Sequence, residues 1–330
     1  MGDVLRTTPL LTALKKKCPK SSITWLVDSS CAAILQDNPI INHLVSYSAK
    51  NLRHLQNERF DWAVNLDKDQ EALEAIEAIS ADKKMGFGRS IEGKVCALDP
   101  LSDYALRLGI DDDLKFLKNK KTYQEISFEQ MGIKFNGEEY LFCIDKKEAR
   151  AAEAHLKKLG VDLKNKNRVI VGINTGAGSR FAGKKLPVAT LVQLADKFYN
   201  ELHATVFLLG GKDESERNRR IEEMSASPVV NTGSHSIQRF AAIVRACDVV
   251  VSGDTTAMHI AIAVKVPVVA YFASTCAQEI EMYGRGRKIV SEISCAPCYK
   301  KICPIDEQCM KDMSVDRIFE ETRALLALPR

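Results

Sequence analysis

The sequence lacks any apolar run long enough to cross a membrane, and it has little glycine or proline. A spanning helix needs about 18 apolar residues, and the longest candidate run, residues 258–273, is interrupted by Lys265 and Pro267. Eighteen glycines and ten prolines in 330 residues exclude collagen-like and other Gly/Pro-rich fibrous classes. The first residues also lack the basic and apolar regions of a secretory signal. We therefore expect a soluble, cytoplasmic protein.

Charge of one sign is not in excess either, because 47 Lys and Arg residues are nearly balanced by 43 Asp and Glu residues. The net charge of +4 permits an anionic substrate or membrane surface as a partner but does not indicate nucleic acid. Hydrophobic residues make up 45% of the chain, which excludes disorder as the dominant state. A length of 330 residues fits two domains of about 150 residues each.

The ten cysteines are too few for a disulfide scaffold in a chain of this length, and they fall into two groups. Six are scattered and are interpreted as reduced core thiols of a cytoplasmic protein. The other four lie within fifteen residues, which is the density of metal ligands; they are Cys295, Cys298, Cys303 and Cys309. A structural zinc site, an iron–sulfur cluster, disulfides and uncoordinated packing thiols all remain open for this cluster.

Short apolar runs alternate with amphipathic helical patterns along the chain. The predicted strands are residues 23–27, 43–45, 60–66, 169–173, 205–209, 249–251 and 266–272. The predicted helices include residues 10–17, 70–79 and 315–328, and another that Pro187 opens. Continuous apolar strands that alternate with helices indicate parallel sheets covered on both faces. We expect an α/β protein of two doubly wound domains, residues 1–160 and 161–313, joined through a polar linker at 157–168 and followed by a C-terminal helix, residues 314–330.

The beginning of the chain departs from this pattern. A doubly wound domain normally starts with a strand, but Gly2 and Asp3 already have the character of the loop that follows such a strand. We expect that the first strand of the N-terminal domain is missing from this sequence. An in-frame apolar strand encoded upstream of Met1 would support this hypothesis, and a stop codon there would contradict it.

Three loops in the second half follow predicted strands, and ligands of open α/β sheets bind beyond the carboxyl ends of the strands. The first loop, residues 174–187, combines small residues with two lysines and suits an anion. Its residues 178–184 match most of a Walker phosphate loop, but Lys185 stands where that loop needs Ser or Thr. An ordinary loop and a phosphate-binding loop both remain open.

The second loop, residues 210–214, has two interpretations. A carboxylate there could accept hydrogen bonds from ribose hydroxyls, or Asp213 could cap the next helix with Glu216 at the third helical position. The third loop, residues 252–259, gathers hydroxyls, a carboxylate and helix N-terminal amides, which together attract phosphate. The alternative to phosphate binding is a structural role for this loop, with Asp254 as a helix cap and His259 in the core. Asp3 is either a cap or a general base for a hydroxyl nucleophile.

Taken together, these segments resemble glycosyltransferase family 9, the ADP-heptose:lipopolysaccharide heptosyltransferases, over residues 1–313. Gly2 and Asp3 match the family's N-terminal Gly-Asp signature. Residues 184–187 match its Lys-x-Trp-Pro motif with Leu186 in place of Trp, and residues 254–259 match its Asp-Thr-Gly-x-x-His motif with Thr256 in place of Gly. The resemblance implies the GT-B fold, with two Rossmann-like domains that face a cleft, and an inverting glycosyltransferase that needs no metal.

The resemblance also implies a role for each matching residue. The C-terminal domain would bind the nucleotide sugar, and the N-terminal domain the acceptor. Asp3 would deprotonate the acceptor hydroxyl, and Lys184 would neutralise charge on the donor diphosphate as it leaves. The implied donor-binding residues are Thr175, Gly176, Glu214 as the ribose contact, Thr255, Thr256 and Ala257 for the phosphates, and Asp254 and His259 to complete the site.

The implied partners are ADP-heptose and a lipopolysaccharide core or lipid A acceptor, with peripheral association at the inner face of the inner membrane and no nucleic acid. Candidates for binding an anionic acceptor are Lys83, Lys84, Arg89 and Lys94, although a solvated basic loop explains them equally well. No cofactor is expected for catalysis, and zinc at the four-cysteine cluster would be structural. A transferase of the same fold with another nucleotide sugar or a surface-polysaccharide acceptor, and a non-catalytic nucleotide- or metal-binding protein, are the alternatives.

Overall fold

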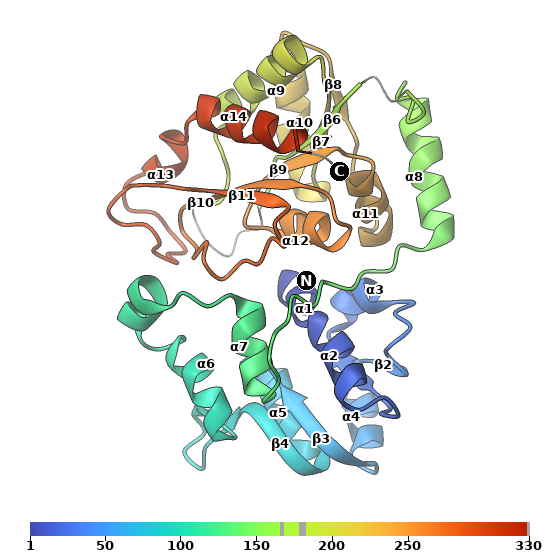
Figure 1. Cartoon of the computed structure of the whole chain (residues 1–330), viewed down its shortest axis with the longest axis vertical. Helices are drawn as coiled ribbons and strands as arrows, with labels where there is room; N and C mark the ends of the chain where they lie inside the picture. Colours follow the sequence, from blue (N-terminus) through green and yellow to red (C-terminus); the bar gives the residue numbers. More distant parts are fainter. Residues whose placement is uncertain (166–167, 178–182, 329–330) are drawn as a thin grey trace. The chain divides into compact units, whose positions relative to one another are not determined.

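The computed structural model describes residues 1–165, 168–177 and 183–328, and its chain divides into two compact units (Figure 1). The C-terminal unit comprises Met1–Leu5, Phe142–Ala277 and Met282–Arg330. The N-terminal unit comprises Arg6–Leu141 and Gln278–Glu281. The division falls before helix α8 (Lys146–Lys158), whereas the sequence placed the boundary after residue 160.

A six-stranded parallel sheet forms the centre of the C-terminal unit, in the order β11-β10-β9-β6-β7-β8. Its strands are β6 (Ile170–Asn174), β7 (Thr205–Leu209), β8 (Val229–Asn231), β9 (Val249–Gly253), β10 (Val268–Phe272) and β11 (Gly286–Val290). Counted from β6, this is the doubly wound order 3-2-1-4-5-6, with its switch point between β6 and β9. The predicted strands of this half are therefore confirmed.

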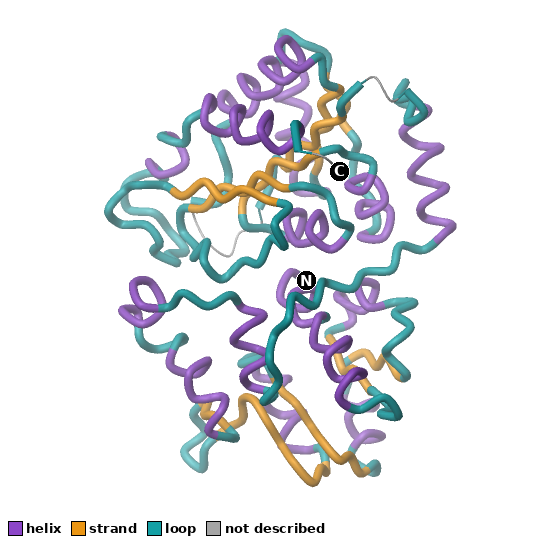
Figure 2. Tube along the Cα trace, viewed as in Figure 1, coloured by secondary structure: helices purple, strands orange, loops and turns teal. Residues whose placement is uncertain are grey.

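Helices cover both faces of this sheet (Figure 2), which explains why β6, β9 and β10 are buried along their whole length. Helices α9 (Val188–Leu202), α10 (Ser215–Met224) and α14 (Val315–Leu326) lie on one face. Helices α11 (Ile237–Arg245) and α12 (Thr256–Ala263) lie on the other, and α8 packs against α11. The short helices η4 (Lys212–Glu214) and α13 (Gln308–Lys311) sit in connections.

The ends of these helices follow local chemistry. Pro187 lies immediately before α9, as the sequence predicted. The hydroxyls of Ser236 and Ser314 accept a hydrogen bond from the third amide of α11 and α14 respectively, and so cap both helices. On α14, Phe319 stacks on Phe198 of α9 with ring centroids 5.7 Å apart, so the predicted final helix completes the core on this face.

The N-terminal unit has two separate small sheets. Strands β1 (Thr24–Val27) and β2 (His43–Ser46) pair in parallel, and β3 (Arg59–Asn65) pairs with β4 (Ser80–Arg89), which pairs with β5 (Val95–Ala97). The helices are α2 (Pro9–Lys17), α3 (Ala32–Leu35), α4 (Ala49–Leu55), α5 (Gln70–Ala78), α6 (Asp103–Arg107) and α7 (Tyr123–Gln130). Within the described ranges no strand joins β1 to β3, so the single doubly wound sheet expected here is split.

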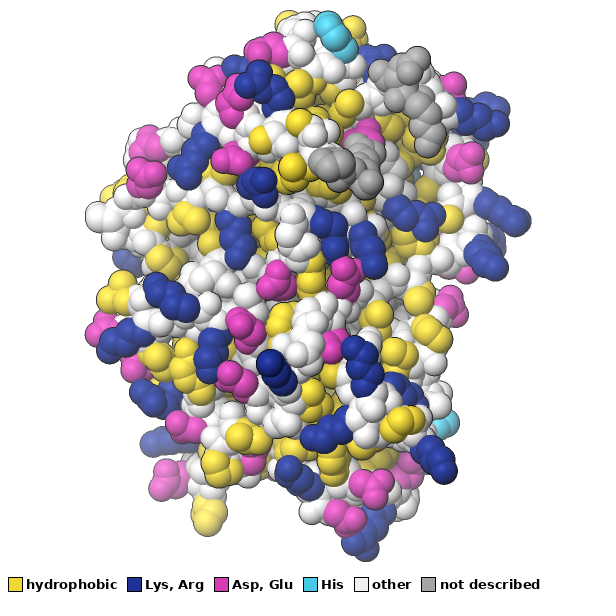
Figure 3. All heavy atoms as spheres, viewed as in Figure 1, with side chains coloured by type: hydrophobic (Ala, Val, Ile, Leu, Met, Phe, Trp, Pro, Cys, Tyr) yellow, Lys and Arg dark blue, Asp and Glu magenta, His cyan; other side chains and the backbone are white. Residues whose placement is uncertain are grey.

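The first residues are helical rather than a loop. Helix α1 (Gly2–Thr7) begins at the second residue and contains Asp3 in its first turn, which corrects the expectation that Asp3 precedes the helix as a cap. In the part of the chain that the structure describes, no helix is both long and apolar enough to cross a membrane. Basic and acidic side chains are interspersed over the face shown in Figure 3.

Candidate functional site

The predicted site residues of the C-terminal unit gather at the switch point of its sheet. Asn174 ends β6, and its side-chain nitrogen lies 2.7 Å from the Gly176 carbonyl oxygen and 3.2 Å from the hydroxyls of both Ser252 and Thr255. Ser252 lies at the end of β9, and Thr255 immediately precedes α12. Asn174 therefore ties the first predicted loop to the third, a role that the sequence did not indicate.

The loop between β9 and α12 holds a partly buried charge cluster. The Lys184 ammonium lies 3.3 Å from one Asp254 carboxylate oxygen, and the His259 Nε2 lies 3.7 Å from the other. Lys184 and Asp254 each expose 18% of their side chains. Thr255 occupies the N-cap position of α12, without a side-chain hydrogen bond to the helix, so the alternative in which Asp254 is the cap is wrong. The Asp254 carboxylate faces lysine and histidine instead.

Gly2 brings the start of the chain to this cluster. A β-carbon placed on Gly2 would lie 2.6 Å from Cδ2 and 3.1 Å from Nε2 of the His259 ring. The next residue, Asp3, is exposed and belongs to the same compact unit as the donor-binding candidates. The exposed carboxylate of Asp3 therefore follows directly after a backbone that touches His259, although the two residues are far apart in the sequence.

Gly176 and Glu214 are in contact, as a shared ribose site would require. A β-carbon on Gly176 would lie 2.1 Å from Oε1 of Glu214, so a larger residue here would displace this carboxylate. The other oxygen, Oε2, accepts a hydrogen bond of 2.9 Å from the Gly211 amide. Gly211 caps η4 and Glu214 ends it, so Asp213 is not the predicted N-cap and Glu216 is not at the third position.

The remaining predicted donor residues are positioned by the backbone of the same sheet edge. The Thr175 hydroxyl lies 2.5 Å from the Asn218 side-chain oxygen of α10 and 3.1 Å from the Leu209 carbonyl oxygen. Thr256 begins α12 and Ala257 follows it, so the amides at this helix start have no partner within the helix. Such amides, together with the positive end of the helix dipole, favour an anion.

Arg217 and Tyr271 lie beside the Lys184 segment, and neither was predicted from the sequence. The Arg217 guanidinium donates a hydrogen bond to the Leu186 carbonyl oxygen. Burial lowers the pKa of Arg217, and burial raises the pKa of Tyr271 to about 12. Arg217 follows Glu214 by three residues, and residues at this spacing are neighbours on a helix. This spacing is the signal in the sequence that could have identified Arg217.

Two groups of predicted residues lie elsewhere. The Walker-like residues 178–182 fall outside the described residues. The basic acceptor candidates are on β4 and on the turn before β5, in the N-terminal unit. Of these, Arg89 lies 3.7 Å from the Glu77 carboxylate and Lys84 donates to the Glu77 carbonyl oxygen, so both are engaged by α5, whereas Lys83 and Lys94 are exposed.

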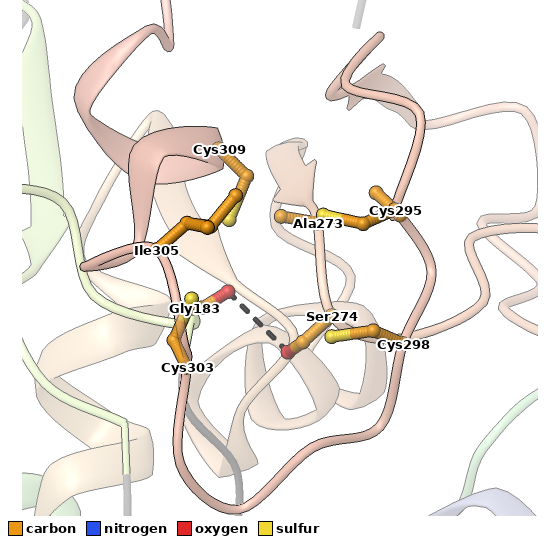
Figure 4. Close-up of a pocket in the computed structure, with 9 residues that line it drawn as sticks. Gly183, Ala273, Ser274, Cys295, Cys298, Cys303, Ile305 and Cys309 are labelled. Atoms are coloured by element: carbon orange, nitrogen blue, oxygen red, sulfur yellow. Dashed lines mark hydrogen bonds between the residues drawn. The ribbon is translucent and has the colours of Figure 1, made fainter.

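The four clustered cysteines line one pocket at the carboxyl end of β10 (Figure 4). The structure contains no disulfide, and among the described residues no three His, Cys, Asp or Glu side chains converge as a ready-made metal site. Burial raises the pKa of the Cys309 thiol to about 11, and the neighbouring thiols add to this shift. The four cysteines therefore share one pocket as free thiols.

Comparison with known proteins adds to this geometry. The model of glycosyltransferase family 9 (heptosyltransferase) matches residues 49–308. The chain is 26% identical to lipooligosaccharide heptosyltransferase 2 of Campylobacter jejuni subsp. jejuni serotype O:6 (strain 81116 / NCTC 11828), over 98% of this chain and 96% of that relative.

Two solved structures have the same fold. The family 9 glycosyl transferase of Veillonella parvula DSM 2008 superimposes with a TM-score of 0.77 at 19% identity, over 98% of this chain and 94% of that one. The ADP-heptose lps heptosyltransferase II of E. coli gives a TM-score of 0.70 at 17% identity, over 98% and 95% of the two chains. The expected GT-B fold is thereby confirmed.

Proposed function

The chain belongs to glycosyltransferase family 9, and on this premise we propose that it transfers a heptose from ADP-heptose to a lipopolysaccharide or lipooligosaccharide core acceptor. The observation that carries the proposal is the convergence of Lys184, Asp254 and the first amides of α12 at the switch point of a doubly wound sheet. The names of the Campylobacter relative and the E. coli structure support the heptose donor and the core acceptor.

The donor diphosphate would lie between the Lys184 ammonium and the first amides of α12. The 3.3 Å pair with Asp254 keeps the lysine at this position before the donor arrives. As the bond between the anomeric carbon and the diphosphate breaks, negative charge grows on the leaving oxygen, and a fixed ammonium and fixed amides stabilise it. We therefore infer that transfer needs no metal at the donor site.

The nucleoside would be held by Glu214. Its carboxylate is fixed by the Gly211 amide and packs on Gly176, which leaves acceptor capacity for ribose hydroxyls. Thr175 is already held by Asn218 and the Leu209 carbonyl, so in this proposal it shapes the loop rather than contacting the sugar.

Asp3 would act as the general base. Its carboxylate takes the proton of the acceptor hydroxyl while that oxygen bonds to the anomeric carbon, and ADP leaves from the opposite face with the pair of electrons of the broken bond. This single displacement inverts the anomeric centre. The support is that Asp3 is exposed and directly follows Gly2, whose backbone touches His259.

The acceptor would be held by the N-terminal unit. Lys83 and Lys94 are exposed basic groups on β4 and just before β5, and Ile91, in the turn between these strands, is fully exposed. Basic and apolar groups together suit the anionic sugar and lipid of such an acceptor, and they also suit peripheral attachment at an anionic membrane surface.

The decisive experiment is a product assay with ADP-heptose and defined core acceptors, beside calorimetry with ADP, UDP and GDP. Heptosylated product and preference for ADP would support the proposal. Preference for UDP or GDP would favour a transferase of the same fold with another donor.

Substitution Asp3→Asn tests the general base. We expect loss of transfer with nearly unchanged ADP affinity, because the amide cannot take the proton. Asp112→Asn, an exposed carboxylate of the N-terminal unit, is the matched control and should retain activity. Full activity of the Asp3 variant would remove Asp3 from the mechanism.

A further inference from the structure

The N-terminal unit holds a half-buried lysine where strand β3 ends. Lys68 lies in the loop between β3 and α5, and its ammonium stands 4.4 Å from the centre of the Phe87 ring of β4. The ammonium donates one hydrogen bond, at 3.1 Å, to the Ala105 carbonyl oxygen of α6. A β-carbon placed on Gly109, just after α6, would lie 2.7 Å from the Lys68 nitrogen. Three other segments of the chain therefore enclose this cation.

No carboxylate forms an ion pair with Lys68 within the part of the chain that the structure describes. The adjacent Asp67 carboxylate instead accepts hydrogen bonds from the backbone amides of Lys68 and Asp69, at 2.7 and 3.0 Å. Burial lowers the pKa of Lys68 and the positive charge of Lys115 lowers it further, while the charge of Glu279 acts in the opposite direction. A half-buried cation without an ion pair is stabilised when an anion binds beside it.

Lys115 brings a second positive charge to this part of the N-terminal unit. It lies on the short helix η3 (Leu114–Lys118), and its backbone carbonyl accepts a hydrogen bond of 3.1 Å from the side chain of Gln278, which ties η3 to a distant segment of the same unit. Two apolar side chains close to it in the sequence, Ile110 and Leu117, expose 78% and 67% of their surface. Cations beside exposed apolar groups suit an amphiphile that carries an anionic group.

We propose that Lys68, assisted by Lys115, binds a phosphate or carboxylate group of the glycolipid acceptor, an assignment that rests on the proposed function. Ligands of parallel sheets bind beyond the carboxyl ends of the strands, and Lys68 follows that end of β3. Lys83, by contrast, lies in the first half of β4, away from that end. The Lys68 ammonium has three protons and the Ala105 carbonyl accepts one, so two can be donated to an oxyanion. Binding is reversible and breaks no bond.

Substitution Lys68→Met tests the assignment, because methionine keeps an apolar stem against Phe87 and removes the charge. We expect the KM for the acceptor to rise about tenfold, since a charge-assisted contact is lost, with ADP affinity and thermal melting close to those of the wild type. Lys118→Met removes an exposed lysine at the end of η3 and is the matched control, which should keep the acceptor KM. An unchanged acceptor KM in a folded Lys68 variant would overturn the proposal.

Chemically modified acceptors identify the anion and separate binding from a structural role. If Lys68 binds a phosphate, the difference in KM between Lys68→Met and the wild type should disappear with an acceptor whose phosphates have been removed. If it binds a carboxylate, the difference should disappear with an acceptor whose carboxyl groups have been esterified. A difference that persists with both modified acceptors would mean that Lys68 acts on the fold alone, and would contradict the assignment.

Binding of free anions separates this proposal from the proposed function. In amide NMR spectra of the full chain, inorganic phosphate or acetate should shift the signals of Lys68 and Gly109, and these shifts should be lost in Lys68→Met. Absence of shifts with both anions would overturn the anion site even if the protein transfers a heptose. Shifts at these amides in a protein that transfers no heptose would support the anion site and contradict the proposed function, so the two failures are distinguishable.

Discussion

At the scale of single residues, the proposed donor site depends on Lys184, which an ion pair with Asp254 holds in place. Lys184 lies on a loop, where a long side chain has many rotamers, and the pair with Asp254 limits them. Both side chains are mostly shielded from water, which strengthens this pair relative to an exposed one. Lys185, the next residue, is exposed and has no such neighbour among the described ion pairs.

Replacing the two lysines separately tests this difference. Lys184→Ala should lower kcat/KM by a factor of about 10²–10³, because one preorganised group that faces the leaving diphosphate is lost. Lys185→Ala should stay close to the wild type. Steady-state kinetics with the nucleotide sugar measures kcat/KM of both variants. Equal losses would mean that the reaction depends on the positive charge of the loop rather than on the position of Lys184.

The position of Gly176 favours glycine, because its backbone lies against the Glu214 carboxylate. A methyl group there would lie 2.1 Å from Oε1 of Glu214, so Gly176→Ala must displace that side chain and weaken nucleotide binding. At Gly211 a β-carbon would lie 3.4 Å from Oε2, an ordinary contact, so Gly211→Ala is the matched control. Calorimetric titration with ADP compares the two. Wild-type affinity in the Gly176 variant would exclude Glu214 as the nucleoside contact.

The residue-level geometry could be predicted from the sequence only in part. The donor-site candidates were identified because motifs after apolar strands share one sheet edge, and the structure brings them to that edge. The roles of Asp254 and Asp213 as caps were wrong, because local capping patterns ignore long-range partners such as Lys184. Asn174, Asn218 and Arg217 were missed because each acts on groups from another loop.

At the scale of elements, the strands of the C-terminal sheet were the most predictable feature. Runs such as Val249-Val250-Val251 are fully buried, and a strand covered on both faces must be apolar throughout. Helix α1 could not be predicted, because a segment of six residues is too short to show a helical period and its helical state depends on tertiary contacts. The split of the N-terminal sheet follows from strand pairing, which the sequence pattern does not specify.

An aromatic contact with α9 is part of the packing that holds helix α14. Phe319 is 1% exposed and stacks on Phe198, so Phe319→Ala should lower the free energy of unfolding by about 3–5 kcal/mol. Leu328, beyond the end of α14, is 45% exposed, and Leu328→Ala should have little effect. Denaturant unfolding monitored by circular dichroism gives both values. A small loss for Phe319 would mean that α14 contributes little to this core.

At the scale of the whole molecule, the two units are not contiguous in sequence. Met1–Leu5 belongs to the C-terminal unit, and Gln278–Glu281 belongs to the N-terminal unit. A domain boundary inferred from composition divides the chain into continuous segments. It therefore cannot detect a short segment that belongs to the other unit. The consequence for function is that Asp3, which the resemblance assigned to the acceptor domain, belongs to the unit that carries the donor-site candidates.

This division predicts where a nucleotide acts. All proposed donor contacts lie in the C-terminal unit, so ADP at about 100 times its Kd should stabilise that unit by about 2.7 kcal/mol. Hydrogen exchange should show the strongest protection at the ends of β6 and β9 and at the start of α12. The Lys184→Ala variant is the control and should show weaker protection at the same ADP concentration. Protection centred on β3 and β4 would instead place the nucleotide in the N-terminal unit, and would contradict the assignment of donor and acceptor to the two units.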